Sequence, residues 1–218
     1  MRIAGVRTFV VGNPVPGEGG RYFLFLKLVT DDGIEGLGEV YVATFSAHVV
    51  ARLIEDVVER HVVGRDPFQI EALARDVYRA GYSGRPDLTL GGVLSGIEMA
   101  LWDIVGKAVD RPVYDLLGGR VRDALRSYTY LYPAPDDPAD VYHDPQVAAQ
   151  RAAEYVARGF TGLKFDPVGR WATGDPRQPE LAAITRTERY VAALREAVGD
   201  RCDLLLGTHG QLTTSGAG

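Results

Sequence analysis

Two side chains able to act on a bound molecule stand at the end of a predicted strand. Lys164 and Asp166 are two positions apart in the segment GLKFD, which begins at Gly162. Side chains two positions apart on a strand point to the same face, so the ammonium and the carboxylate share a face of the sheet. One interpretation is a structural ion pair. The other is a pair of groups that act on a substrate.

A single histidine follows a second predicted strand. His209 stands in the segment GTHGQ, directly after the apolar run at residues 204–206. A lone histidine before a glycine is most often a solvated loop residue, whereas a position at the end of a strand also suits proton transfer. The only cysteine, Cys202, opens the same apolar run, which indicates a buried structural thiol rather than a nucleophile. It cannot form an intrachain disulfide and fits a reducing compartment.

The composition is that of a globular protein. The chain has 218 residues, of which 46% are hydrophobic and 24% charged, with a formal net charge of -5. This length predicts one or two domains. No block of lysine and arginine stands out, so we expect no nucleic-acid partner. The N-terminus lacks an apolar signal region, and no apolar stretch approaches the roughly 18 residues of a membrane span. We therefore expect a cytoplasmic protein that contacts no membrane.

The first half of the chain predicts an α+β domain. The turn signal DDG at residues 31–33 joins two strong strand patterns into an antiparallel meander. Helical periodicity then predicts two amphipathic helices and a more buried third helix that is rich in small residues. The predicted strands are residues 2–10, 21–30 and 34–40. The predicted helices are residues 47–63, 67–81 and 91–109.

Strands alternate with helices after residue 125, which predicts right-handed crossovers and a parallel sheet. The predicted strands are residues 127–132, 160–165 and 202–206, and the predicted helices are residues 145–158 and 180–198. The sequence thus predicts a capping domain at residues 1–122 and a partial (β/α) barrel at residues 123–218.

A long and specific pattern fills residues 94–118, LSGIEMALWDIVGKAVDRPVYDLLG. Over this segment the chain resembles the mandelate racemase/muconate lactonizing enzyme branch of the enolase superfamily. The resemblance extends over the whole chain. It implies an α+β N-terminal capping domain, an antiparallel meander plus helices, followed by the first strands of a TIM-type (β/α) barrel.

The resemblance also implies substrate-binding residues in the cap. The loop at residues 13–20 matches the loop that closes over the substrate in this family, although a simple surface hairpin is equally compatible with its composition. The candidate substrate-binding residues near this loop are Tyr22, Tyr41 and Thr44.

The chemistry of this family removes a proton α to a carboxylate, and Mg²⁺ stabilises the resulting enediolate. Lys164 matches the first lysine of the family's Lys-x-Lys motif, while Asp166 replaces the second. We expect Lys164 to contact the substrate carboxylate, and Asp166 to bind a hydroxyl or to orient Lys164. His209 matches the histidine of an Asp-x-His motif in acid-sugar dehydratases, where it protonates the departing 3-hydroxyl as general acid.

The first metal-ligand position of the family falls on Gly207, which has no side chain to ligate. Either the register shifts, or Asp166 compensates, or the metal site is unusual, and no metal ligand is assigned. The chain has room for only the first barrel strands, so the resemblance implies a truncated chain.

The resemblance therefore implies a Mg²⁺-dependent hydro-lyase that converts an aldonate or aldarate to a 2-keto-3-deoxy acid. Its partner would be a small-molecule sugar acid, and its full-length form a homo-oligomer. We expect the 218-residue chain to be inactive alone. The alternatives are a non-catalytic remnant and a racemase or cycloisomerase relative, against which the missing second lysine counts.

Overall fold

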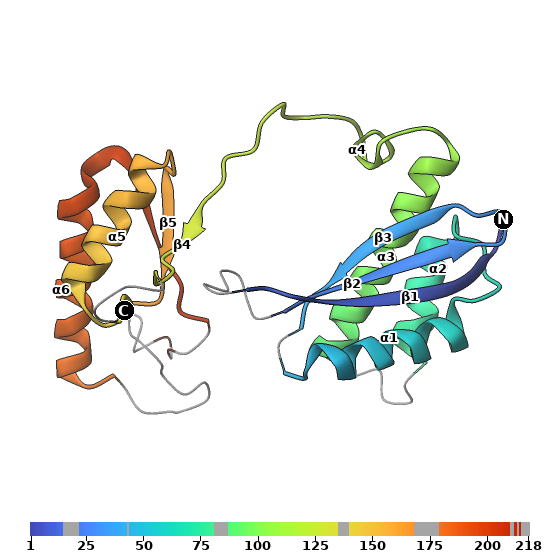
Figure 1. Ribbon diagram of the computed structural model, residues 1–218, viewed down its shortest axis with the longest axis horizontal. Helices are drawn as coiled ribbons and strands as arrows, with labels where there is room; N and C mark the ends of the chain where they lie inside the picture. Colours follow the sequence, from blue (N-terminus) through green and yellow to red (C-terminus); the bar gives the residue numbers. More distant parts are fainter. Residues whose placement is uncertain are drawn as a thin grey trace. The chain divides into compact units, whose positions relative to one another are not determined.

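The computed structural model describes residues 1–14, 22–42, 44–80, 87–134, 140–167, 179–209, 212 and 214. The chain divides into two compact units, Met1–Asp123 and Ala124–Gly218 (Figure 1). Each unit has its own hydrophobic core.

The first unit begins with an antiparallel meander of three strands in the order β1-β2-β3. The strands are β1 (Ile3–Gly12), β2 (Tyr22–Thr30) and β3 (Glu35–Val40). From Leu24 onward every second residue of β2 is buried, which is the pattern of a strand with one face on a core. Gly33 adopts φ +89° in the turn before β3, a conformation that glycine reaches without strain. The predicted meander is confirmed.

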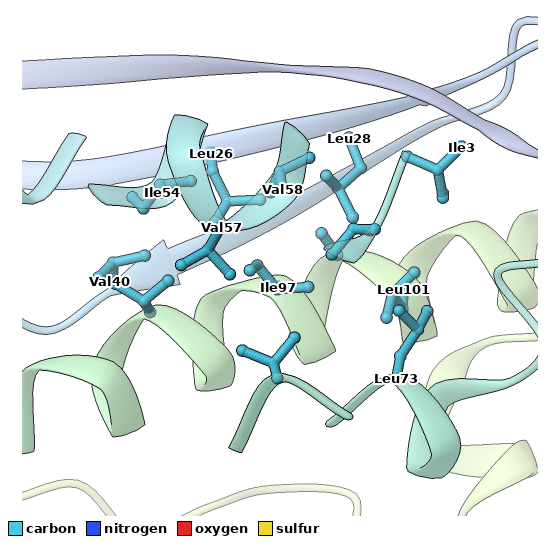
Figure 2. Close-up of a cluster of buried hydrophobic side chains, with 14 of the residues drawn as sticks. Ile3, Leu26, Leu28, Val40, Ile54, Val57, Val58, Leu73, Ile97 and Leu101 are labelled. Carbon is cyan, nitrogen blue, oxygen red and sulfur yellow. The ribbon is translucent and has the colours of Figure 1, made fainter. Parts of the chain in front are cut away.

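Helices α1 (Ala47–His61), α2 (Ile70–Arg79) and α3 (Leu88–Ala108) complete this unit. Helices α1 and α3 pack on the sheet, and α2 packs against both helices (Figure 1). Figure 2 shows the core between them, where Leu26 and Leu28 of β2 meet Ile54 and Val58 of α1 and Ile97 of α3.

Helix boundaries depend on local hydrogen bonds that the periodicity did not reveal. Helix α3 begins three residues earlier than predicted, because the Asp87 side chain accepts hydrogen bonds from the backbone N–H groups of Thr89 and Leu90. A four-residue helix, α4 (Val113–Leu116), was not predicted. It is too short for a periodic pattern.

Helix α3 lies against β3 at backbone distance. A Cβ atom added to Gly38 would stand 1.9 Å from the carbonyl oxygen of Gly96, and one added to Gly36 would stand 2.1 Å from that of Ala100. No side chain fits between the two elements at these positions. The small residues predicted for this helix thus lie at its contact with the sheet.

The expectation that no segment is long and apolar enough to cross a membrane was wrong. Helix α3 has 21 residues and passes that test by length and composition alone. The physical reason is its place in the fold: it packs against the sheet on one side and α2 on another, and eight of its residues are buried. A core helix covered from several sides is apolar over much of its circumference.

The second unit contains a parallel sheet in the order β4-β5-β6, joined by helices. Its elements are β4 (Thr129–Tyr130), α5 (Pro145–Ala157), β5 (Gly162–Phe165), α6 (Leu181–Val198), the 3-10 helix η1 (Gly199–Arg201) and β6 (Asp203–Leu206). Helices α5 and α6 lie side by side on one face of the sheet (Figure 1). Parallel strands joined by helices that lie on one face are the arrangement that begins a (β/α) barrel. Strand β4 has two residues, where six were predicted.

The core of this unit lies between the sheet and its two helices. Leu163 and Phe165 of β5 are fully buried against Ala152 of α5 and Leu194 of α6. Cys202 is also buried in this core as a free thiol, which confirms its structural assignment. Burial raises the pKa of its thiol.

Candidate active site at the ends of three strands

Polar side chains gather where the three parallel strands end. Tyr130 is the last residue of β4, Asp166 directly follows β5, and His209 lies three residues after the end of β6. The register aligns these ends, since Tyr130 pairs with Lys164 and Phe165 pairs with Leu206. The carboxyl ends of barrel strands are where TIM-type enzymes place their reactive groups.

The Asp166 carboxylate holds this cluster together. The Tyr130 hydroxyl donates a hydrogen bond to Oδ2 of Asp166, and Nδ1 of His209 lies 2.9 Å from Oδ1. The Asp166 side chain is 27% exposed, whereas that of His209 is 55% exposed. A carboxylate that accepts from two donors is fixed in orientation, and it fixes its donors in turn.

Lys164 is not the partner of Asp166. The carboxylate pairs with His209, so the structure lacks the ion pair between Lys164 and Asp166 that their shared face suggested. That Asp166 binds a substrate hydroxyl or orients Lys164 stays a prediction. Lys164 is half-buried beside the cluster. Substrate contact by Lys164 stays a prediction.

Gly207 provides the space that the Asp166 carboxylate occupies. A Cβ atom at position 207 would stand 2.7 Å from Oδ1 of Asp166 and 3.0 Å from Cε of Lys164. The backbone N–H of Gly207 donates to the carbonyl of Phe165 at 2.8 Å, so its place in the sheet is fixed. The Asp166 carboxylate therefore lies where a side chain at position 207 would stand, and the three alternatives for the first metal-ligand position stay open.

His209 has a backbone conformation that few side chains adopt. Its φ is +47°, in the left-handed region, where histidine is more common than most other non-glycine residues. The residue is exposed on a loop, as one interpretation of the sequence expected, yet its ring is held by Asp166. Uncommon backbone conformations that persist beside polar clusters are typical of functional sites.

The phenol of Tyr130 is a proton donor over the physiological range. Burial raises its pKa above the usual range, and the hydrogen bond to Asp166 with its negative charge raises it further. Its ring lies 5.6 Å from the ring of Tyr132 and 6.3 Å from that of Tyr142. Tyr130 was not among the residues predicted from the sequence. Its position at the carboxyl end of the strand before β5 was the available signal.

The candidate cap residues lie in the first unit. Tyr41 and Thr44 line one small depression together with Phe45 and Leu88. Tyr22 does not line it, and its ring packs edge-on against His48 at 6.3 Å. Their substrate-binding role stays a prediction. Of the predicted closing loop, residues 15–20 lie outside the described residues.

The described part of the chain does not by itself fit a Mg²⁺ site. No group of three or more His, Cys, Asp and Glu side chains close enough to hold a metal ion occurs among these residues. Asp166 offers the hard carboxylate oxygens that Mg²⁺ prefers, but Gly207 contributes no ligand. The cofactor therefore stays a prediction.

An α+β cap followed by the first strands of a (β/α) barrel, with polar groups at the strand ends, defines a class of barrel enzymes. Residues 18–118 match the family profile "Mandelate racemase / muconate lactonizing enzyme, N-terminal domain". The chain belongs to this family of the enolase superfamily.

Named relatives are similar over most of this chain. D-gluconate dehydratase from Thermoproteus tenax is 35% identical over 90% of the chain and 37% of its own length. D-galactonate dehydratase from Xanthomonas oryzae pv. oryzae is 36% identical over 87% of the chain and 46% of its own length. The chain thus spans less than half the length of these curated relatives.

A solved structure shares the fold of the whole chain. It is a provisionally assigned mandelate racemase/muconate lactonizing enzyme from Labrenzia alexandrii DFL-11, 54% identical, with a TM-score of 0.91. The match covers 100% of this chain and 57% of that one. The agreement includes both units and supports their assignment to a cap and the beginning of a barrel.

Proposed function

We propose that this chain supplies part of the active site of a dehydratase that acts on a sugar acid. The activity would belong to a protein of the relatives' length, which converts an aldonate or aldarate to a 2-keto-3-deoxy acid. The observation that carries the proposal is the imidazole of His209, held by Asp166 at the end of the third barrel strand. The names of the relatives from Thermoproteus tenax and Xanthomonas oryzae support it.

The proposed reaction removes water across two carbon atoms. A base takes the proton from C2, next to the carboxylate, and an enediolate forms. His209, with a proton on both ring nitrogens, then gives the proton on Nε2 to the 3-hydroxyl. The C3–O bond breaks, water leaves, and the neutral ring keeps its proton on Nδ1. The enol that remains becomes the 2-keto-3-deoxy acid. We assign His209 as the general acid and Lys164 as the contact to the substrate carboxylate, while no described residue is assigned as the C2 base.

Asp166 is assigned a supporting role. Its contact with Nδ1 of His209 leaves Nε2 of the same ring as the nitrogen that exchanges a proton with the substrate. Mg²⁺ is the cofactor that the family implies, and it would stabilise the enediolate. A homo-oligomeric state and a cytoplasmic location complete the proposal.

A chimera tests this function. Residues 1–218 of this chain are joined to the remaining sequence of the Labrenzia alexandrii protein, with which the chain shares 54% identity. The chimera is incubated with aldonates and aldarates in the presence of Mg²⁺, and the 2-keto-3-deoxy acid is quantified. We expect product from at least one sugar acid. The 218-residue chain alone is the control, and we expect no product from it, because its described residues hold no cluster of metal ligands.

Two outcomes would overturn the proposal. A folded chimera that epimerises or cyclises its substrates without loss of water would support the racemase or cycloisomerase alternative. A chimera that dehydrates equally well when His209 is replaced by asparagine would remove His209 from the reaction.

A further inference from the structure

We infer that Tyr130 and Gly207 position His209 through Asp166, and that they keep its imidazole in the tautomer with the proton on Nδ1. The inference rests on the proposed function, because this tautomer matters for the reaction only if Nε2 exchanges a proton with the substrate. Tyr130 and Gly207 touch no reacting atom in this scheme, so both are positioning residues. Neither was a candidate in the sequence.

The first step is the orientation of the Asp166 carboxylate. A carboxylate directly after a strand is able to rotate about χ2 unless both oxygens are held. Here the Tyr130 hydroxyl holds Oδ2. The phenol ring is itself fixed by packing against Tyr132 and Tyr142, and the N–H of Leu131 is bonded to the Lys164 carbonyl at 2.9 Å. Tyr130 therefore acts as a rigid donor.

The second step is the space at Gly207. The Asp166 carboxylate and a side chain at position 207 cannot both fit here. Even a Cβ atom at position 207 would stand 2.7 Å from Oδ1 of Asp166. The other close atom, Cε of Lys164, belongs to a flexible side chain that is able to move. An alanine at this position would therefore displace the Asp166 carboxylate before it disturbed the sheet.

The third step is the effect on the imidazole. A carboxylate accepts hydrogen bonds but donates none, so the Nδ1 atom that lies 2.9 Å from Oδ1 must carry a proton. A neutral ring then has its lone pair on Nε2. Neutral imidazole in water favours the proton on Nε2, so the cluster selects the other form. The left-handed backbone of His209 holds the ring within reach of Asp166.

Nitrogen NMR measures the tautomer directly on the 218-residue chain. The protein is labelled with ¹⁵N at histidine, and spectra are recorded at a pH where the rings are neutral. The chain has four histidines, and the His209→Asn variant assigns the signal of interest. We expect Nδ1 of His209 to be the protonated nitrogen in the wild type.

Three variants test the three steps. Asp166→Ala should convert His209 to the form with Nε2 protonated. Tyr130→Phe and Gly207→Ala should each give a mixture of the two tautomers, because both variants keep the Asp166 carboxylate. The first releases its Oδ2 from the hydrogen bond, and the second displaces its Oδ1. His143 is an internal control, since its Nδ1 lies 2.6 Å from Oδ2 of Asp140 in the same unit, and its signals should stay unchanged. Thr208→Ala is the matched variant outside the cluster and should behave as the wild type.

The inference fails if His209 carries its proton on Nε2 in the wild type. It also fails if Tyr130→Phe and Gly207→Ala both leave the tautomer unchanged while His143 reports a folded unit. The NMR result does not depend on turnover. An inactive chimera with the expected tautomer would overturn the proposed function alone, and an active chimera with the other tautomer would overturn the positioning alone.

Discussion

The hydrogen bond between Asp166 and His209 engages Nδ1 of the imidazole and leaves Nε2 for the substrate. The held Nδ1 faces a carboxylate that is itself bound by Tyr130. The arrangement gives His209 a defined orientation although its side chain is more than half exposed. An exposed histidine without such a partner samples many rotamers and contributes little to proton transfer.

Replacing His209 tests its place in the chemistry. In the chimera with the Labrenzia alexandrii remainder, His209→Asn should lower kcat by about 10²–10⁴-fold, because that is the usual contribution of a general acid. KM should change little, since asparagine keeps a polar side chain of similar size. Steady-state kinetics on the sugar acid that the chimera accepts gives both constants. A kcat within a factor of about three of the parent would contradict the assignment.

Contacts between side chains that are distant in the sequence are what the sequence predicts least well. The shared face of Lys164 and Asp166 follows from strand periodicity, and His209 from its position after an apolar run. The partner of Asp166 was not predictable in this way, because Tyr130 and His209 are 36 and 43 residues distant along the chain. Such contacts become predictable only when the register between the strands is known.

Helix α3 and strand β3 meet through backbone atoms at Gly36 and Gly38, and the absence of side chains at these two positions lets the helix approach the sheet closely. The elements themselves were predictable, because the alternation of Leu24, Leu26 and Leu28 is local and strong. The ends of elements were less predictable, because the start of α3 depends on the two hydrogen bonds that the Asp87 side chain accepts, and β4 pairs with β5 at only two residues.

A side chain at position 38 should destabilise the cap. Gly38→Ala places a Cβ atom 1.9 Å from a backbone oxygen, which cannot move without shifting the helix. We expect a loss in the free energy of unfolding of about 1–3 kcal/mol or more, the usual effect of overpacking. Gly91→Ala is the control within α3, where nothing lies within 4 Å of the added atom. It should stabilise the helix by about 0.5–1 kcal/mol. Thermal unfolding followed by circular dichroism distinguishes the two, and equal effects would contradict the packing argument.

Hydrogen exchange should rank the elements of the second unit. Strand β5 is bonded on both sides, whereas β4 and β6 are the outer strands of the described sheet. Outer strands exchange sooner because one row of their backbone groups is unpaired. We expect protection in the order β5 above β6 and β4, and the cap strand β2 above all three. Equal protection of β5 and β6 would show that another segment covers that edge.

The two units differ in the burial of their tyrosines. Burial is the main cause of a raised pKa at Tyr130, Tyr142 and Tyr190, which all lie in the second unit. Tyr190 belongs to the hydrophobic core, where its hydroxyl donates to the Val141 carbonyl at 2.7 Å. The tyrosines described in the cap are exposed.

This difference predicts that alkaline pH unfolds the second unit first. Below the ordinary tyrosine pKa of about 10, both states keep the phenolic protons and the stability of this unit is complete. Above it, the unfolded state loses protons that the folded state retains, so stability falls as pH rises toward the raised pKa values. Amide spectra recorded during an alkaline titration would show signals of residues 124–218 disappearing before those of the cap. Loss of both units together, or of the cap first, would contradict the prediction.

Asp166 joins two strands that do not touch each other. Strand β5 lies between β4 and β6, so no backbone hydrogen bond connects Tyr130 to the segment that carries His209. The carboxylate is nevertheless shared by both, which makes it a point of energetic coupling across the sheet. The effects of Tyr130→Phe and His209→Asn on stability should therefore not add, and a double-mutant cycle should give an interaction energy of about 0.5–3 kcal/mol. The same cycle in an Asp166→Ala background should give none, because the carboxylate that both side chains contact would have been removed.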